Sequence, residues 1–143
     1  MQLKCAQKGL AIVEFTLVAP IFLVLLFGIC EFGLILYDKA IITNASREAA
    51  RSGIAYRTPK LTTTQIQAVA NNYCTSYLVT FHSGINPTVT VAQSSPPDFG
   101  TPLKVTVTYN YYNLVFGNLL SLLSGGAFPN PLLLSAETTM NNE

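Results

Sequence analysis

Glu14 is the residue whose type and position raise the first chemical question about this sequence. It lies near the start of an almost wholly apolar run between Lys8 and Asp38. That run is long enough to cross a membrane, since about 20 apolar residues span the hydrocarbon core. An acidic side chain at mid-membrane costs about 2.5–3.5 kcal/mol on insertion scales. We therefore expect Glu14 to have a partner, and the nature of that partner bears directly on function.

Motifs for catalysis or metal binding are not found. Serine and threonine are plentiful, but no base is placed to activate one, and His82 falls at an expected helix end. Nucleophile-elbow, phosphate-loop and dinucleotide-binding patterns are missing. Cys5, Cys30 and Cys74 lie far apart, whereas a metal site needs three or four clustered ligands. We expect no catalytic residue, metal, cofactor or small-molecule substrate.

Composition favours a small domain with a membrane anchor. Of the 143 residues, 50% are hydrophobic and 10% are charged. Ordinary soluble domains carry about 25% charged residues. The formal net charge is +1, which gives no electrostatic basis for binding nucleic acid.

The apolar run predicts a membrane-spanning helix over residues 10–37. It is about twice as long as the apolar region of a cleaved secretory signal. Pro20 lies inside the span, where membrane helices tolerate proline. Gly28 and Gly33 would allow another helix to approach closely, although no G-x-x-x-G pattern joins them.

Glu31 is the second acidic residue of the span. It follows Glu14 by 17 residues, so the two side chains lie about 100° apart around a helix and do not share a face. Glu31 could sit at the far membrane interface, where its cost falls. The sequence leaves its role open.

The helix is expected to continue beyond the span through residues 38–57, because no breaker precedes Thr58-Pro59. This stretch carries Arg47, Glu48 and Arg51, and Glu48 can pair with Arg51 one helical turn away. We predict juxtamembrane ion pairs among these three side chains.

Residues 58–143 predict a small α+β domain. A capping box, formed by Thr62 with Gln65 or by Thr64 with Gln67, opens an amphipathic helix that extends to about residue 81. Strands are expected over 88–93, 103–112 and 132–140 because apolar residues alternate there or turn residues precede the run. One face of the strand over residues 103–112 supplies core residues, namely Val105, Val107, Tyr109 and Tyr111. The expected fold is thus a long N-terminal helix, half spanning and half projecting, with one amphipathic helix packed on about three antiparallel strands.

An apolar stretch over residues 114–123 exceeds what one small sheet can bury. Helix and loop both remain open for it, as do local packing and contact with a partner or a membrane. The candidate contact patch consists of Phe116, Leu119, Leu120, Leu122 and Leu123.

The N-terminal sequence resembles a known family. Residues 9–15, GLAIVEF, are similar to the processing site of type IV prepilins. With residues 27–33, FGICEFG, and 44–51, NASREAAR, they resemble the TadE-like pseudopilins of tight-adherence (Flp) pili. Residues 135–140 also fit that family's closing strand. The family usually has glycine where Ala49 stands.

The resemblance implies processing and a topology, which the distribution of positive charge alone leaves open. Residues 1–9 would be a cytoplasmic leader, removed by prepilin peptidase between Gly9 and Leu10. Glu14 would become the fifth residue of the mature chain, followed by Phe15. The protein would then be a single-pass protein of the bacterial inner membrane with its C-terminal domain outside, and it could enter the pilus.

The leading hypothesis from the sequence is a minor pseudopilin. Its partners would be prepilin peptidase, other pilins and pseudopilins, the pilus assembly platform and inner-membrane lipid. The new α-amino group of Leu10 on a neighbouring subunit would neutralise Glu14 and set the register of packing. The alternatives are a membrane-anchored binding or scaffold protein unrelated to pili, and an anchored enzyme, for which no catalytic constellation is found.

Overall fold

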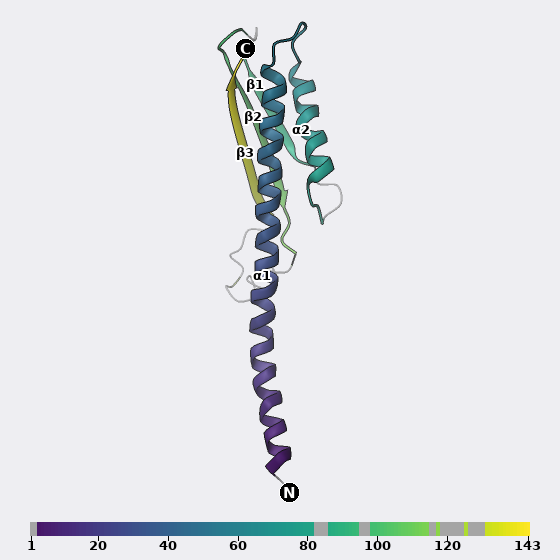
Figure 1. Ribbon diagram of the computed structural model, residues 1–143, viewed down its shortest axis with the longest axis vertical. Helices are drawn as coiled ribbons and strands as arrows, with labels where there is room; N and C mark the ends of the chain where they lie inside the picture. Colours follow the sequence, from purple (N-terminus) through teal and green to yellow (C-terminus); the bar gives the residue numbers. More distant parts are fainter. Residues whose placement is uncertain (1–2, 82–85, 95–97, 115–116, 118–124, 126–130) are drawn as a thin grey trace. The chain divides into compact units, whose positions relative to one another are not determined.

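The protein folds into two helices and three strands (Figure 1). They are α1 (Leu3–Ile54), α2 (Thr63–Tyr77), β1 (Thr88–Gln93), β2 (Pro102–Tyr111) and β3 (Leu132–Asn141). The computed structural model describes residues 3–81, 86–94, 98–114, 117, 125 and 131–143, with side chains from residue 11 onward. The predicted α+β class is confirmed, as are the long N-terminal helix and the antiparallel sheet.

The chain divides into two compact units, which we describe separately. One comprises Met1–Gly33 with Asn113–Phe128, and the other comprises Leu34–Tyr112 with Pro129–Glu143. Helix α1 is continuous and includes Pro20. It begins at Leu3, so it contains most of the predicted leader, and it ends at Ile54 within the expected range.

The sheet of the second unit has the strand order β1-β2-β3, with both neighbouring pairs antiparallel. In the register, Val107 of β2 lies opposite Val89 of β1 and Ala136 of β3. The predicted strands are confirmed to within one residue at each end. The alternation in the sequence determined them because one face of β2 is buried and the other is not.

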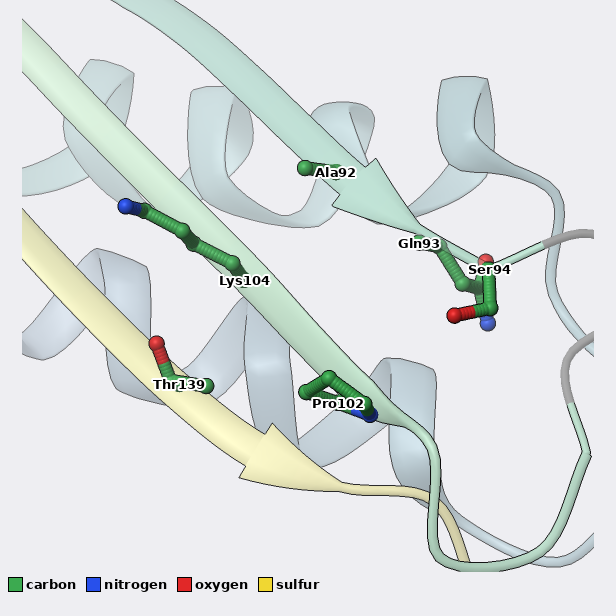
Figure 2. A pocket seen from close by; sticks show the side chains of 6 residues that line it. All are labelled: Ala92, Gln93, Ser94, Pro102, Lys104 and Thr139. Carbon is green, nitrogen blue, oxygen red and sulfur yellow. The ribbon is translucent and has the colours of Figure 1, made fainter.

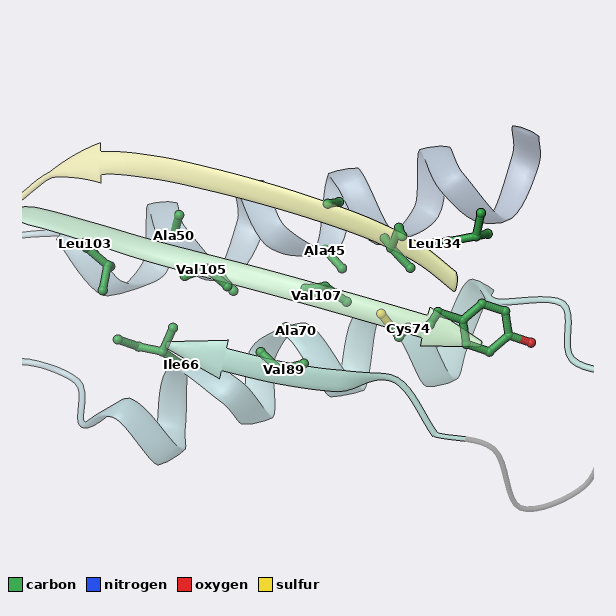
Figure 3. Close-up of a cluster of buried hydrophobic side chains, with 14 of the residues drawn as sticks. Ala45, Ala50, Ile66, Ala70, Cys74, Val89, Leu103, Val105, Val107 and Leu134 are labelled. Atoms are coloured by element: carbon green, nitrogen blue, oxygen red, sulfur yellow. The ribbon is translucent and has the colours of Figure 1, made fainter. Parts of the chain in front are cut away.

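The core lies between that face of β2 and the two helices. Leu103, Val105, Val107, Tyr109 and Tyr111 are buried in turn along β2. They pack with residues of α1 and α2, as Figure 3 shows for part of the cluster. From α1 this core contains the small residues Ala45, Ala49 and Ala50, and from α2 it contains Ile66, Ala70 and Cys74. The alanines let the helix backbone approach the sheet closely.

Helix α2 begins with the first of the two predicted capping boxes. The Thr62 hydroxyl oxygen accepts from the Gln65 backbone N–H at 3.3 Å, and the Gln65 side-chain oxygen accepts from the Thr62 N–H at 2.9 Å. The predicted end near Phe81 is wrong, because α2 ends at Tyr77 and Leu78 is extended. The Val79 N–H binds the Asp38 carboxylate at 3.2 Å. The Val79 N–H, which would bond to a backbone carbonyl of α2 if the helix continued, is thus used in a tertiary contact to α1.

Each helix is tied to a different outer strand. The Lys39 ammonium and the Ser46 hydroxyl of α1 hydrogen-bond with the Ser135 carbonyl and the Thr138 hydroxyl of β3. The Gln67 amide of α2 donates to the Val89 carbonyl of β1 at 3.1 Å. These contacts tie one edge of the sheet, β3, to α1 and the other edge, β1, to α2.

The C-terminus closes the second unit through Asn142, whose side chain is buried. Its amide nitrogen donates to the Thr101 carbonyl at 3.0 Å, and Lys60 donates to its side-chain oxygen at 3.4 Å. The neighbouring Glu143 N–H reaches the carbonyl of Ile54 at 3.3 Å. The end of α1 and the loops after α1 and β1 are therefore held together by one residue and its neighbour.

Gly53→Ala tests the close packing of α1 on the core. A Cβ at Gly53 would lie 2.5 Å from a methyl group of Leu103 and 2.8 Å from one of Ile66, both of them buried. Overpacking costs about 1–3 kcal/mol, and alanine regains about 1 kcal/mol of helix propensity. We expect the free energy of unfolding to fall by about 1 kcal/mol, as measured by thermal unfolding of the full chain in detergent micelles. Gly33→Ala is the control, because nothing lies within 4 Å of its Cβ position; equal effects of the two changes would contradict this packing.

Candidate functional site

The apolar part of α1 in the first unit is an uncovered surface. Among the described residues, one helix is long and apolar enough to cross a membrane, and its window of highest hydropathy, at a mean of 2.5, has no buried residue. Phe15 is 73% exposed, Phe22 60% and Ile29 72%. This area has no partner within the described chain. Apolar surfaces of this size are typical of contacts with lipid or with other protein.

Glu14 lies on this surface with its side chain exposed. Within the part of the chain that the structure describes, no group pairs with its carboxylate. Gly9 and Leu10 precede it by one to two turns in the same helix, and Phe15, which follows it, is exposed as well. The structure thus places the predicted processing residues together on the first turns of α1.

The predicted helix-packing residues have different surroundings. Pro20 is exposed within the continuous helix. Gly28 is half-buried and lines a shallow hollow together with Val24, Leu25, Ile29 and Phe32. Gly33 faces open space. Gly33 therefore leaves room for another helix, since no atom of the described chain lies within 4 Å of its Cβ position.

Glu31, in contrast, has a partner within its own unit. Its side chain is 4% exposed, and one carboxylate oxygen accepts a hydrogen bond from the Leu114 backbone N–H at 2.7 Å. The two glutamates of the span therefore differ in their exposure and in their contacts. Glu14 presents its carboxylate outward, whereas Glu31 binds the segment that follows β2.

Asp38 is a buried acid that sequence reasoning missed. It is fully buried in the second unit, where one carboxylate oxygen accepts from Val79 and the other has no hydrogen-bond partner among the described groups. Burial raises the pKa of the Asp38 carboxyl, against the effect of the Val79 hydrogen bond. Burial also raises the pKa of Tyr109, and the charge of Asp38 adds to that rise.

A sequence pattern could have found Asp38. It follows Glu31 by seven residues, and residues seven apart on a helix lie within about 20° of the same face. An acid repeated on one face of an apolar helix indicates that this face is covered. A comparison of Glu14 with Glu31 does not show this, since those two residues lie on different faces of the helix.

The predicted juxtamembrane ion pair is not formed. Arg47, Glu48 and Arg51 are exposed, and in the described ranges the salt bridge that is present joins Lys104 to Glu137 at 2.8 Å. An exposed pair gains little, because water competes for both charges and each side chain loses freedom. These three charges remain available on the outer face of α1.

The predicted contact patch of Phe116, Leu119, Leu120, Leu122 and Leu123 lies outside the described residues. Leu114, which opens this apolar stretch, is 41% exposed.

Other features of the described chain do not form a reactive site. A shallow hollow of about 440 Å³ lies beside β2 (Figure 2), and its charged residue, Lys104, is already paired with Glu137. No three His, Cys, Asp or Glu side chains gather as potential metal ligands in the described ranges. Cys74 is a buried free thiol, and burial raises its pKa to about 11.

The comparison with protein families concerns the helix that carries the two glutamates. Residues 9–51 match the TadE-like protein family. The match begins at Gly9, covers Glu14, Glu31 and Asp38, and ends at Arg51, so it confirms the resemblance. The TadE-like segment is thus α1 from the predicted cleavage site almost to its end. No curated protein and no solved structure matches the sequence significantly.

Asp38→Asn tests the cost of the buried acid. The folded chain binds the Asp38 proton more tightly than the unfolded chain, in which the pKa is near its ordinary value of 3.8. The stability that this group contributes is therefore fully present below that pH and is lost as the pH rises through the raised folded pKa. We expect Asp38→Asn to be more stable than the parent at neutral pH, with a gap that narrows below pH 4, because asparagine keeps an acceptor for Val79 without a charge.

The measurement is thermal unfolding of the full chain in detergent micelles as a function of pH. Asp98→Asn is the matched control, because Asp98 is exposed. A stability gap for Asp38→Asn that does not change with pH would mean that the carboxylate is not buried at a cost.

Proposed function

We propose that this chain is a minor pseudopilin of a tight-adherence pilus. The family match associates it with such pili, and TadE-like components are structural. The observation that carries the proposal is the uncovered apolar half of α1, with Glu14 exposed and unpaired among the described groups. A helix of this kind is a packing element, and its function is to bind other helices.

Processing is the first step of the proposed function. Prepilin peptidase would hydrolyse the peptide bond between Gly9 and Leu10, release residues 1–9 and leave an α-amino group on Leu10. This bond lies in the first turns of α1, where local opening costs least. Gly9 lowers that cost further, because glycine is about 1 kcal/mol less favourable than alanine in a helix.

The new amine supplies the partner that Glu14 lacks. Within one chain, Leu10 and Glu14 are four residues apart, so the amine lies about one helical turn from the carboxylate. Between neighbouring subunits, the amine of one chain and the Glu14 carboxylate of the next would neutralise each other in a low dielectric. The pair would fix the axial register, since any other offset leaves both charges unpaired.

The remaining partners follow from this role. The apolar half of α1 would lie in the inner membrane before assembly and against other pilins and pseudopilins afterwards. The second unit, with α2 and the sheet, would stay outside the cytoplasm, and the assembly platform would act on the membrane-embedded helix. Arg47, Glu48 and Arg51, exposed on the same helix, are available for charges on neighbouring subunits.

Intact-mass and N-terminal analysis of the protein from native membranes tests the processing step. We expect a mature chain that begins at Leu10. We also expect a Gly9→Val variant to keep residues 1–9, because the prepilin-type site that this sequence resembles is cut after a glycine. A parent protein that still begins at Met1 would remove the pseudopilin proposal and favour an anchored scaffold protein.

Glu14→Leu separates assembly from insertion. It makes the span more apolar, so membrane insertion improves, while the partner amine loses its counter-charge. Removing one member of a buried pair costs about 3–5 kcal/mol, which corresponds to more than about a hundredfold loss of incorporation. Membrane fractionation and immunoblotting of purified pili measure the two effects, and Val18→Leu, at an exposed apolar position, is the control. Unchanged incorporation of Glu14→Leu would contradict the register argument.

A further inference from the structure

Two adjacent residues of α1 hold the C-terminal end of α2. The Tyr37 hydroxyl donates to the Tyr77 carbonyl, and the Asp38 carboxylate accepts from the Val79 N–H, each at 3.2 Å. Helix α2 runs antiparallel to this part of α1 (Figure 1). Because both bonds reach the same turn of α1, the end of α2 is fixed at the height of Tyr37 and Asp38 along that helix.

The start of β3 is fixed at a similar height by other contacts. Lys39 hydrogen-bonds with Ser135, and Ser46 hydrogen-bonds with Thr138. Between these two contacts α1 rises about 10 Å over seven residues and β3 rises about 10 Å over three, so the strand follows the helix in the same direction. Leu133 precedes Ser135 by two residues, or about 7 Å. It therefore lies level with the position about five residues before Lys39 on α1.

These heights correspond to the border of the proposed membrane span. The apolar run between Lys8 and Asp38 covers 30 residues, which is about 45 Å of helix. A bilayer is about 40–45 Å thick with its headgroups, and about 30 Å without them. With α1 inserted, Asp38 lies at the outer edge of the headgroup layer. Tyr77 is then within that layer, and Leu133 is at its boundary with the acyl chains.

The side chains exposed at this height are aromatic or aliphatic. Tyr77 is 53% exposed and Leu133 64%, and Tyr37 and Phe81 are exposed as well. Tyrosine is enriched where membrane meets water, because its ring is apolar and its hydroxyl is polar. No Asp, Glu, Lys or Arg occurs within residues 61–97, so the surface of α2 carries no acidic or basic side chain of these types.

We propose that Tyr77, Phe81 and Leu133 form a surface of the second unit that rests on the bilayer. Its occupant is phospholipid, between the headgroups and the first carbons of the acyl chains. The printed contacts favour lipid over a protein partner, because they set α2 and β3 at the height where an inserted α1 passes through the headgroups. Contact through two separate elements would also fix the tilt of this unit on the membrane. The inference rests on the membrane insertion of α1, which belongs to the proposed function, but not on cleavage or pilus assembly.

Tryptophan fluorescence of the full chain in phosphatidylcholine vesicles tests this inference. The sequence has no tryptophan, so one substitution reports on one position. Tyr77→Trp and Leu133→Trp probe the proposed surface on α2 and on β3. Phe22→Trp marks the middle of the span. Phe99→Trp marks water, because Phe99 is 88% exposed in the loop that binds Asn142 at the opposite end of the second unit.

The quenchers report on depth. Lipids brominated close to the headgroup quench from the shallow acyl region, lipids brominated near the chain ends quench from the bilayer centre, and iodide quenches from water. We expect the emission of Tyr77→Trp and Leu133→Trp to be lost mainly to shallow bromine, that of Phe22→Trp mainly to deep bromine, and that of Phe99→Trp to iodide alone. Few chains per vesicle keep neighbouring copies apart.

Two results would overturn the inference. One is quenching of Tyr77→Trp or Leu133→Trp by iodide to the same extent as Phe99→Trp, with no effect of brominated lipid. The other is protection of either probe from all three quenchers, which would show that protein covers the surface. If Phe22→Trp also escapes brominated lipid, α1 is not inserted, and the membrane part of the proposed function fails too. If Phe22→Trp is quenched and the two probes are not, only this inference fails.

Discussion

The rest of the structure depends on one constraint: the single continuous helix α1 packs into a protein core along one part of its length and exposes an apolar surface along the other. Towards its C-terminal end, Ala45, Ala49 and Ala50 are buried in the same core cluster as residues of the sheet. Towards its N-terminal end the same helix exposes large apolar side chains that no described part of the chain covers. The first condition gives a folded unit, and the second favours association of the helix with lipid or with other helices. The proposed pseudopilin role is the simplest way for one helix to meet both conditions.

Three acidic residues divide the tasks along this helix. Glu31 and Asp38 share a face, and each accepts a backbone N–H from a segment that follows a secondary-structure element, Leu114 after β2 and Val79 after α2. These two acids make contacts within the chain. Each accepts a hydrogen bond from a backbone N–H that lies just beyond the end of β2 or α2 and is not used in that element. Glu14 lies on another face with no described partner, and it is therefore the acid suited to act between chains. All three residues are acidic, so the face of α1 on which each one lies, and not its residue type, distinguishes contacts within the chain from contacts between chains.

Local patterns predicted most of the fold, and tertiary contacts account for the rest. Alternation gave β1, β2 and β3 because one sheet face is buried, and the Thr62–Gln65 pair gave the start of α2. The end of α2 could not be predicted, because the Asp38 carboxylate, far away in sequence, takes the Val79 N–H. The predicted Glu48–Arg51 ion pair is not formed. Helical spacing allows the two side chains to meet, but both are exposed and water competes for their charges. For the candidate site, the choice of Glu14 and its neighbours from the sequence stays a prediction. The partner of Glu31 could not be predicted, because Leu114 is far from it in the sequence and no local pattern encodes that contact.

Photo-crosslinking from α1 in assembling cells tests most directly whether its uncovered half binds other helices. A photoreactive amino acid at Val18, one turn from Glu14 and 57% exposed, should yield adducts with the N-terminal peptide of another pilin-type subunit, identified by mass spectrometry. The yield should fall when Glu14 is replaced by leucine. Adducts with lipid alone, at the same yield with and without Glu14, would contradict the account.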